Sequence, residues 1–272
     1  MPPDFPYPEK LYQPLNRCAY CPSDVQLSTE HIISLGLGGK LIFPKASCES
    51  CRKATSKVED FILRKYLCAL RSHLSLPSRN PGGRPESYKL KLYKNGRSWT
   101  QKVPLSKHPG DVRFVMFEPP GRVAGRPLEQ PTYSIRLVEG VIFPDAKERL
   151  RALGADGAKD KVAVNAMALA RIVAKIGLSY AIAELGLDAF EQTYVNHLVR
   201  AEAADWHHWI GGYDRGRIVE PVTLHELRLL RRGQDLSTIV HLFVPYCPRD
   251  AYEVVVGRLR PGSELPPELQ LK

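Results

Sequence analysis

Four of the six cysteines form two pairs, and two residues separate the members of each pair. Cys18 and Cys21 make the first pair, and Cys48 and Cys51 make the second. Thiolates in this paired spacing are typical ligands of a tetrahedral zinc ion. Because four thiolates would fill every position around the metal, no place is left for a reactive water, and we expect structural Zn²⁺.

The dipeptide Glu30-His31 lies between the two cysteine pairs. A neutral histidine can take a proton from water near pH 7, and a carboxylate is a hard ligand for Mg²⁺ or Mn²⁺. Phosphodiester hydrolysis uses both a general base and a divalent cation. Neighbouring strand residues point to opposite faces, so the two side chains can share one site only if the backbone bends there. Without its flanking cysteines, the dipeptide would indicate an ordinary surface pair.

Residues 17–60 resemble the zinc-knuckle subtype of the HNH, or ββα-metal, endonuclease family. The resemblance rests on the two knuckles, on Glu30-His31 followed by Ile32-Ile33, and on the Gly38-Gly39 turn before the second knuckle and a helix. It implies a ββα fold in which His31 is the general base and Glu30 binds a catalytic Mg²⁺ or Mn²⁺. The implied function is hydrolysis of phosphodiester bonds in nucleic acid, expected to be DNA.

The chain departs from the family pattern at two places. The loop before the helix has no Asn to orient the base, and Arg52 follows the last cysteine where the family usually has a His or Asn ligand. Arginine cannot ligate a cation, and Glu59 is the best substitute ligand further along, although it could be a plain surface charge. Arg52, Lys53 and Lys57 could instead contact phosphates. The alternatives are therefore a catalytically impaired, zinc-containing nucleic-acid-binding protein, or a zinc-stabilised scaffold.

A basic segment follows the cysteine-rich part of the chain. Residues 76–112 contain eight Lys and Arg against two Asp and Glu, within a chain whose net charge is +10. Lysines and arginines interleaved with Tyr88, Tyr93 and Trp99 suit phosphate contacts with stacking on bases. The candidate contacts are Lys89, Lys91, Lys94 and Arg97. The alternative is a solvated hairpin whose charge only favours solubility.

The hydrophobic pattern predicts an α+β protein. With the resemblance, it implies a small zinc-stapled ββα-metal module followed by a larger mixed α+β domain. We divide the chain into a module (1–75), a basic β-rich segment (76–143) and an α+β domain of unknown role (144–272). A helical pattern runs from residue 47 to 70, and Asn95-Gly96 predicts a hairpin of strands 88–93 and 98–105. Further predictions are strands 112–117, 133–143, 241–247 and 251–259, and helices 159–186, broken at Gly177, and 191–203.

Composition indicates where in the cell the protein is expected and what kind of partner it is expected to bind. No run approaches the roughly 18 apolar residues of a membrane helix, and the first residues do not resemble a signal peptide. Paired cysteines in an otherwise cysteine-poor chain favour metal binding in a reducing compartment. We therefore expect a cytoplasmic protein that binds nucleic acid and no membrane, and the oligomeric state stays open. The segment Asp205–Trp209 holds two histidines, and we interpret it as core packing rather than as a second metal site.

Overall fold

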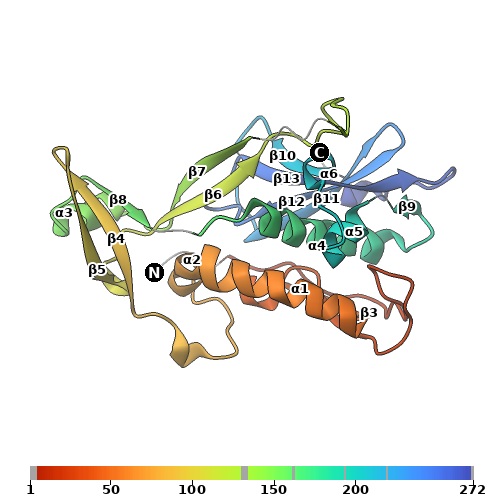
Figure 1. Ribbon diagram of the computed structural model, residues 1–272, viewed down its shortest axis with the longest axis horizontal. Coiled ribbons are helices and arrows are strands. Elements are labelled where there is room, and N and C mark those ends of the chain that lie inside the picture. Colours follow the sequence, from red (N-terminus) through yellow and green to blue (C-terminus); the bar gives the residue numbers. More distant parts are fainter. Residues whose placement is uncertain (1–4, 130–133, 161–162, 193, 219, 271–272) are drawn as a thin grey trace.

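The computed structural model shows an α+β protein in three layers (Figure 1). It describes the chain apart from residues 1–4, 130–133, 161–162, 193, 219 and 271–272. The N-terminal module forms one outer layer, a long helix lies in the middle, and a C-terminal antiparallel sheet forms the other outer layer. One hydrophobic cluster joins all three layers, from Tyr12 to Leu265.

The N-terminal module is a three-stranded sheet followed by a helix. Its strands are β1 (Glu9–Leu11), β2 (Ser28–His31) and β3 (Lys40–Ser47), in the order β1-β3-β2. Helix α1 (Glu49–Phe61) begins directly after β3 and continues through a π-helical turn (Ile62–Tyr66) into α2 (Cys68–His73). Strands β2 and β3 pair antiparallel, so β2, β3 and α1 form a ββα unit.

A tight turn between β2 and β3 fixes the geometry of this unit. A single 3-10 turn (Leu35–Leu37) ends at Gly38, whose φ of 87° lies in the left-handed region that favours glycine. At Gly39 a β-carbon would lie 1.8 Å from the carbonyl oxygen of Ile33. Gly38 is thus required by its left-handed conformation and Gly39 by close backbone contact, and any side chain at Gly39 would push the two strands apart.

The C-terminal layer is a five-stranded antiparallel sheet. Its strand order is β10-β13-β12-β11, and β9 pairs with the end of β13, beyond the residues that pair with β10. The sheet strands are β9 (Phe190–Gln192), β10 (Ile210–Asp214), β11 (His225–Arg232), β12 (Asp235–Leu242) and β13 (Asp250–Leu259). Two short helices, α5 (Val195–Arg200) and α6 (Trp206–Trp209), lie between β9 and β10.

Helix α4 (Ala166–Leu185) is the central element of the protein. It packs on β12 and β13 on one side and on α1 and α5 on the other, which explains why its apolar residues surround the helix. Gly177 does not break the helix as predicted. A β-carbon there would lie 2.9 Å from the side chain of Val254, so the glycine allows close packing on β13. By length and composition α4 could cross a membrane, but most of it is buried inside the protein.

A separate small unit extends from one end of the molecule (Figure 1). Strands β4 (Ser87–Lys94) and β5 (Arg97–Pro104) form the predicted hairpin, with positive φ at both Asn95 and Gly96. Strand β8 (Gly157–Asp160) pairs with β4, and α3 (Ala146–Ala152) lies beside them. A core of its own holds the unit together: Leu90, Leu92, Val103 and Ala155. The remaining ribbon pairs β6 (Asp111–Phe117) with β7 (Ile135–Val141).

Some predicted elements have different bounds. The first residues of the predicted helix 159–186 belong to β8 or lie outside the described residues, and α4 starts only at Ala166. The predicted helix 191–203 is divided between β9 and α5. The predicted strand 241–247 is wrong beyond Leu242, because Phe243 has a φ of 56° and turns the chain. The predicted strand 133–143 is shorter, and its first residue lies outside the described part of the chain.

Candidate metal centre and the Glu30 site

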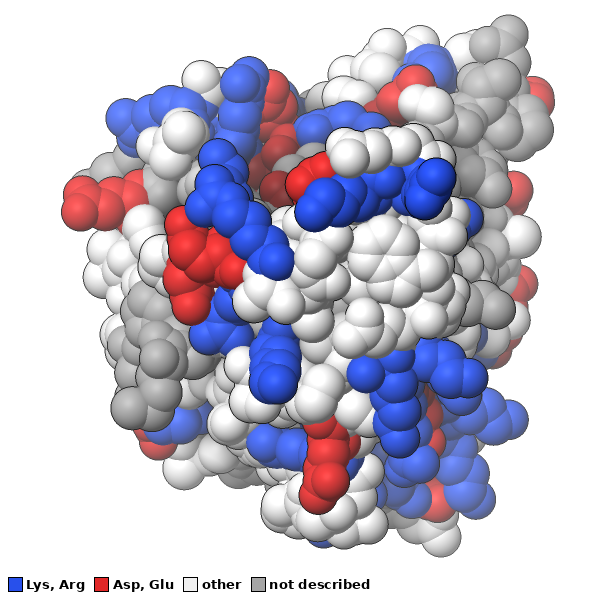
Figure 2. Space-filling view, turned by 90° about the vertical axis from the view of Figure 1, so that its left-hand side faces the viewer, with Lys and Arg blue, Asp and Glu red and all other residues white. Residues whose placement is uncertain are grey.

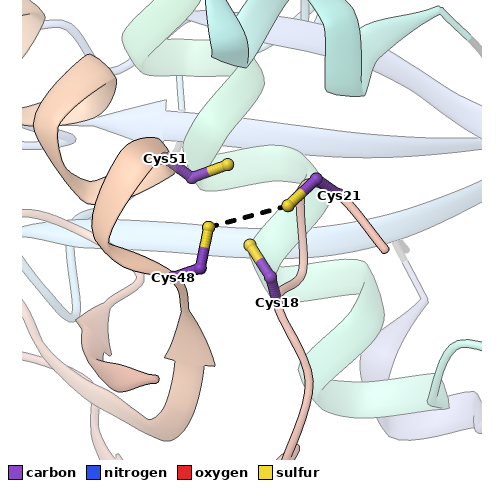
Figure 3. Close-up of side chains that lie close together, drawn as sticks. All are labelled: Cys18, Cys21, Cys48 and Cys51. Atoms are coloured by element: carbon purple, nitrogen blue, oxygen red, sulfur yellow. Dashed lines mark hydrogen bonds between the residues drawn. The ribbon is translucent and has the colours of Figure 1, made fainter. Parts of the chain in front are cut away.

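The four paired cysteines converge on one point (Figure 3). Cys18 and Cys21 lie in the loop between β1 and β2, Cys48 is the N-cap of α1, and Cys51 lies in its first turn. All four sulfurs lie within 4.8 Å of one another, and the Sγ atoms of Cys21 and Cys48 are 3.6 Å apart. A tetrahedron with metal–sulfur bonds of about 2.3 Å has edges of about 3.8 Å. The sulfurs can therefore hold a metal ion such as zinc.

Backbone hydrogen bonds hold the cysteine loop in place. The amide of Cys18 donates to the carbonyl of Ser23 (2.8 Å), and the amide of Ala19 donates to the carbonyl of Ala46 (2.8 Å). A hydrogen bond from Cys51 lowers the pKa of Cys18 to about 4, and the same interaction raises the pKa of Cys51. Because metal binding requires thiolates, a site that already favours one thiolate is suited to a cation. Four sulfur ligands leave no open position, which is the arrangement of a structural site.

The carboxylates of Glu30 and Glu59 both form ion pairs with a buried lysine, Lys175, which was not among the predicted site residues. The Nζ atom of Lys175, from α4, lies 2.6 Å from Oε1 of Glu30 and 3.1 Å from Oε1 of Glu59. It also donates to the carbonyl oxygens of His31 and Ile32. The side chain of Lys175 is only 1% exposed. The ammonium group is thus surrounded by four oxygen atoms, a ligand set that a hard divalent cation would also accept.

The charges of this triad stabilise one another. Burial would lower the pKa of Lys175, but the carboxylates of Glu30 and Glu59 outweigh burial and raise it. Burial likewise opposes ionisation of Glu59, yet the positive charge of Lys175 outweighs it, and the pKa of Glu59 is lowered. The ammonium and the Glu59 carboxylate therefore remain charged at neutral pH. A divalent cation could occupy the same place only if Lys175 moved away.

His31 meets this triad through its backbone. Its carbonyl oxygen accepts a hydrogen bond from Lys175, and the residue is half-buried. The pairing of β2 with β3 is irregular between Ser28 and Glu30. This irregularity falls just before the Glu-His dipeptide, where a shared site for the two side chains would require the backbone to bend.

Helix α4 supports the module at a second point as well. The hydroxyl groups of Tyr20, in the first knuckle, and Ser179 lie 2.7 Å apart, and both residues are fully buried. Ser179 follows Lys175 by one turn of the same helix. The knuckle and the Glu30 strand therefore both rest on α4.

The basic residues proposed for nucleic-acid contact lie in two places. On α1, Arg52 and Lys53 are exposed and both form ion pairs with Glu49 (2.7 and 3.3 Å), while Lys57 is exposed further along the helix. The others belong to the β4–β5 hairpin at the end of the molecule: Lys89 and Lys91 in β4, and Lys94 and Arg97, which face each other beside the turn. The two groups belong to different structural units.

The histidines of α6 belong to no cluster of three or more potential metal ligands among the described residues. Among the described residues, the four cysteines are the one group in which three or more potential ligand atoms converge. Trp206, His207 and His208 are buried, and the ring of Trp206 packs on Phe117. This arrangement agrees with the interpretation of the segment as core packing.

Lys175 is the site residue that sequence reasoning missed. The available signal was that Lys175 and Arg171 are the two charged residues in the otherwise largely apolar segment 166–182, because a charged residue on a buried helix needs a polar partner or one of opposite charge. No protein-family model matches this chain, and neither a curated protein nor a solved structure matches it significantly. The interpretation of the site therefore rests on its own residues and geometry.

Proposed function

We propose that this chain is a nucleic-acid-binding protein built on a zinc-stapled, HNH-like module in which a lysine stands in place of the catalytic metal. The observation that carries the proposal is the position of the Lys175 ammonium between Glu30 and Glu59. These are the two carboxylates that a metal-dependent nuclease of this pattern would use. Because the ammonium of one buried lysine already pairs with both carboxylates, the module keeps its shape and has no open position for a divalent cation.

The charge distribution supports nucleic acid as the partner. The chain carries a net charge of +10, and exposed lysines and arginines lie on the hairpin of β4 and β5. A protein that contacts phosphates through such residues binds more weakly as the salt concentration rises. On α1 the ion pairs to Glu49 reduce the free positive charge, so the hairpin supports the proposal more strongly than the helix.

Electrophoretic mobility shift and plasmid nicking, with one zinc-loaded preparation, test this function. We expect binding that falls steeply with salt, and no nicking when Mg²⁺ or Mn²⁺ is added. Absence of binding to DNA and RNA at low salt would refute the proposal. Cleavage that is lost in the Glu30→Gln variant would refute the part that concerns catalysis.

Metal-dependent cleavage by the HNH mechanism is the second candidate. It is favoured by the position of Glu30 and Glu59, since both carboxylates already share a cation, and Lys175 also contacts the backbone carbonyl of His31. In this function His31 would accept the proton of the attacking water, once Lys175 had given way to Mg²⁺ or Mn²⁺. The His31→Ala variant would then lose nicking, whereas His197→Ala, on the surface of α5, would retain it. Equal nicking by both variants would indicate a contaminant.

A further inference from the structure

The sheet of the small end unit has one strongly basic face. Strand β4 places Lys89, Lys91 and Tyr93 on this face, because alternate residues of a strand point to the same side. Their cross-strand partners are Lys102, Thr100 and Ser98 on β5, and Lys159 and Gly157 on β8. We call the surface formed by Lys89, Lys91, Tyr93, Lys102 and Lys159 the lysine face.

The lysine face is the solvent side of the sheet. Leu90 and Leu92 point the other way, into the small core of the unit. All four lysines of the face are exposed, and Tyr93 is half-exposed. Among the described residues, no carboxylate forms an ion pair with any of these four lysines. Figure 2, which views this end of the molecule, shows many Lys and Arg side chains and fewer Asp and Glu.

Tyr93 lies among the positive charges of this surface. The Nζ atoms of Lys91 and Lys159 lie 5.5 and 5.6 Å from the centre of its ring. An aromatic ring next to ammonium groups offers a stacking surface for a base and contacts for the adjoining phosphates. A duplex exposes its phosphates but hides the faces of its bases inside the stack, whereas a single strand presents both together.

We propose that the lysine face binds single-stranded nucleic acid, with Tyr93 stacked on a base and Lys89, Lys91, Lys102 and Lys159 in contact with phosphates. This inference rests on the proposed nucleic-acid-binding function and names its ligand and its surface. Lys102 and Lys159 join the contacts expected from the sequence. Lys159 comes from β8, which begins 53 positions after the end of β5, so only the folded sheet brings it there.

Fluorescence anisotropy with labelled oligo-thymidine and oligo-uridine, compared with a labelled DNA duplex of equal length, tests the inference. We expect the zinc-loaded wild-type chain to prefer the single strands. The Tyr93→Ala variant should bind them roughly tenfold more weakly, and Tyr93→Phe should bind nearly as well as the wild type. Circular dichroism of each variant shows whether the fold is retained.

A charge-matched pair of double variants separates the lysine face from general basicity. Lys91→Gln/Lys159→Gln should weaken single-strand binding and reduce the slope of log affinity against log salt by about 1.4. Lys147→Gln/Arg151→Gln removes the same charge from α3 and should leave most of the affinity. Equal effects of the two double variants, or preference for the duplex, would overturn this inference and leave the proposed function standing. Failure to bind any of the probes would refute both.

Discussion

Replacement of Lys175 by methionine tests the central feature of the site. The substitution removes the ammonium group and keeps much of the volume of the side chain. Two carboxylates, 9% and 24% exposed, would then share a buried site without a positive partner. Removal of one partner from a buried ion pair costs about 3–5 kcal/mol of unfolding free energy. We expect a loss of that size at neutral pH, measured by urea unfolding of the zinc-loaded protein.

The Lys40→Met variant is the matched control. Lys40 also pairs with a glutamate, Glu9, at 3.1 Å, but both side chains are exposed, at 49% and 71%. An exposed ion pair contributes at most about 1 kcal/mol. A charge-neutral triple variant, Lys175→Met with Glu30→Gln and Glu59→Gln, should regain part of the stability lost by the single substitution, because no uncompensated charge remains buried. If Lys175→Met cost no more than Lys40→Met, the reasoning about the triad would be refuted.

The pH dependence gives the same test a second readout. Since the pKa of Glu59 is lowered in the folded protein, its contribution to stability is complete above the ordinary carboxyl pKa of about 4.5 and is lost as the pH falls through the lowered value. The loss of unfolding free energy in Lys175→Met should therefore shrink in acid, where the carboxyl groups take up protons.

The Lys175→Met variant should also gain thermal stability from added Mn²⁺, because the ion can replace the lost charge. An equal gain in the wild type would contradict the view that Lys175 fills the position.

Three further predictions concern other parts of the fold. Burial lowers the pKa of His225 from 6.5 to about 4. Its contribution to stability should therefore be complete above about pH 6.5 and be lost as the pH falls towards 4. The His225→Phe variant should remove about 3 kcal/mol of this pH dependence, measured by urea unfolding. Gly39→Ala should lower the unfolding free energy by about 3 kcal/mol or more, whereas Gly82→Ala, where a β-carbon meets no atom closer than 4.0 Å, should change it little. Metal analysis should find about one zinc ion per chain; Cys51→Ser should lose the ion and much of the thermal stability, while Cys68→Ser, outside the cluster, should keep the ion.

Local patterns predicted the parts of the structure that depend on neighbouring residues. The cysteine pairs indicated a metal site because each pair needs only its own short loop. Asn95-Gly96 indicated the hairpin because both residues readily adopt positive φ. The sequence also indicated Glu30 and Glu59 as candidate ligands of a divalent cation, and the structure places both carboxylates at one ammonium group.

The features that the sequence did not predict depend on contacts between residues far apart in the chain. Gly177 suggested a helix break, since nothing near it in sequence reveals that Val254 will pack against it. Lys175 is 145 positions from Glu30 in the chain, and no local sequence pattern predicts that the two residues form an ion pair. The predicted strand beyond Leu242 had a suitable apolar composition, but the positive φ of Phe243 ends it, a conformation that a bulky residue seldom adopts without tertiary contacts.

The dependence of the first knuckle and the Glu30 strand on α4 has a consequence for how this protein can be dissected. A fragment that ended after residue 75 would expose the Tyr20 hydroxyl and the Glu30 carboxylate, which meet Ser179 and Lys175 in the intact chain. The N-terminal module with its four-cysteine cluster is therefore not a portable unit that could be excised or grafted onto another protein with its site intact. Its shape is maintained jointly by the two halves of the polypeptide.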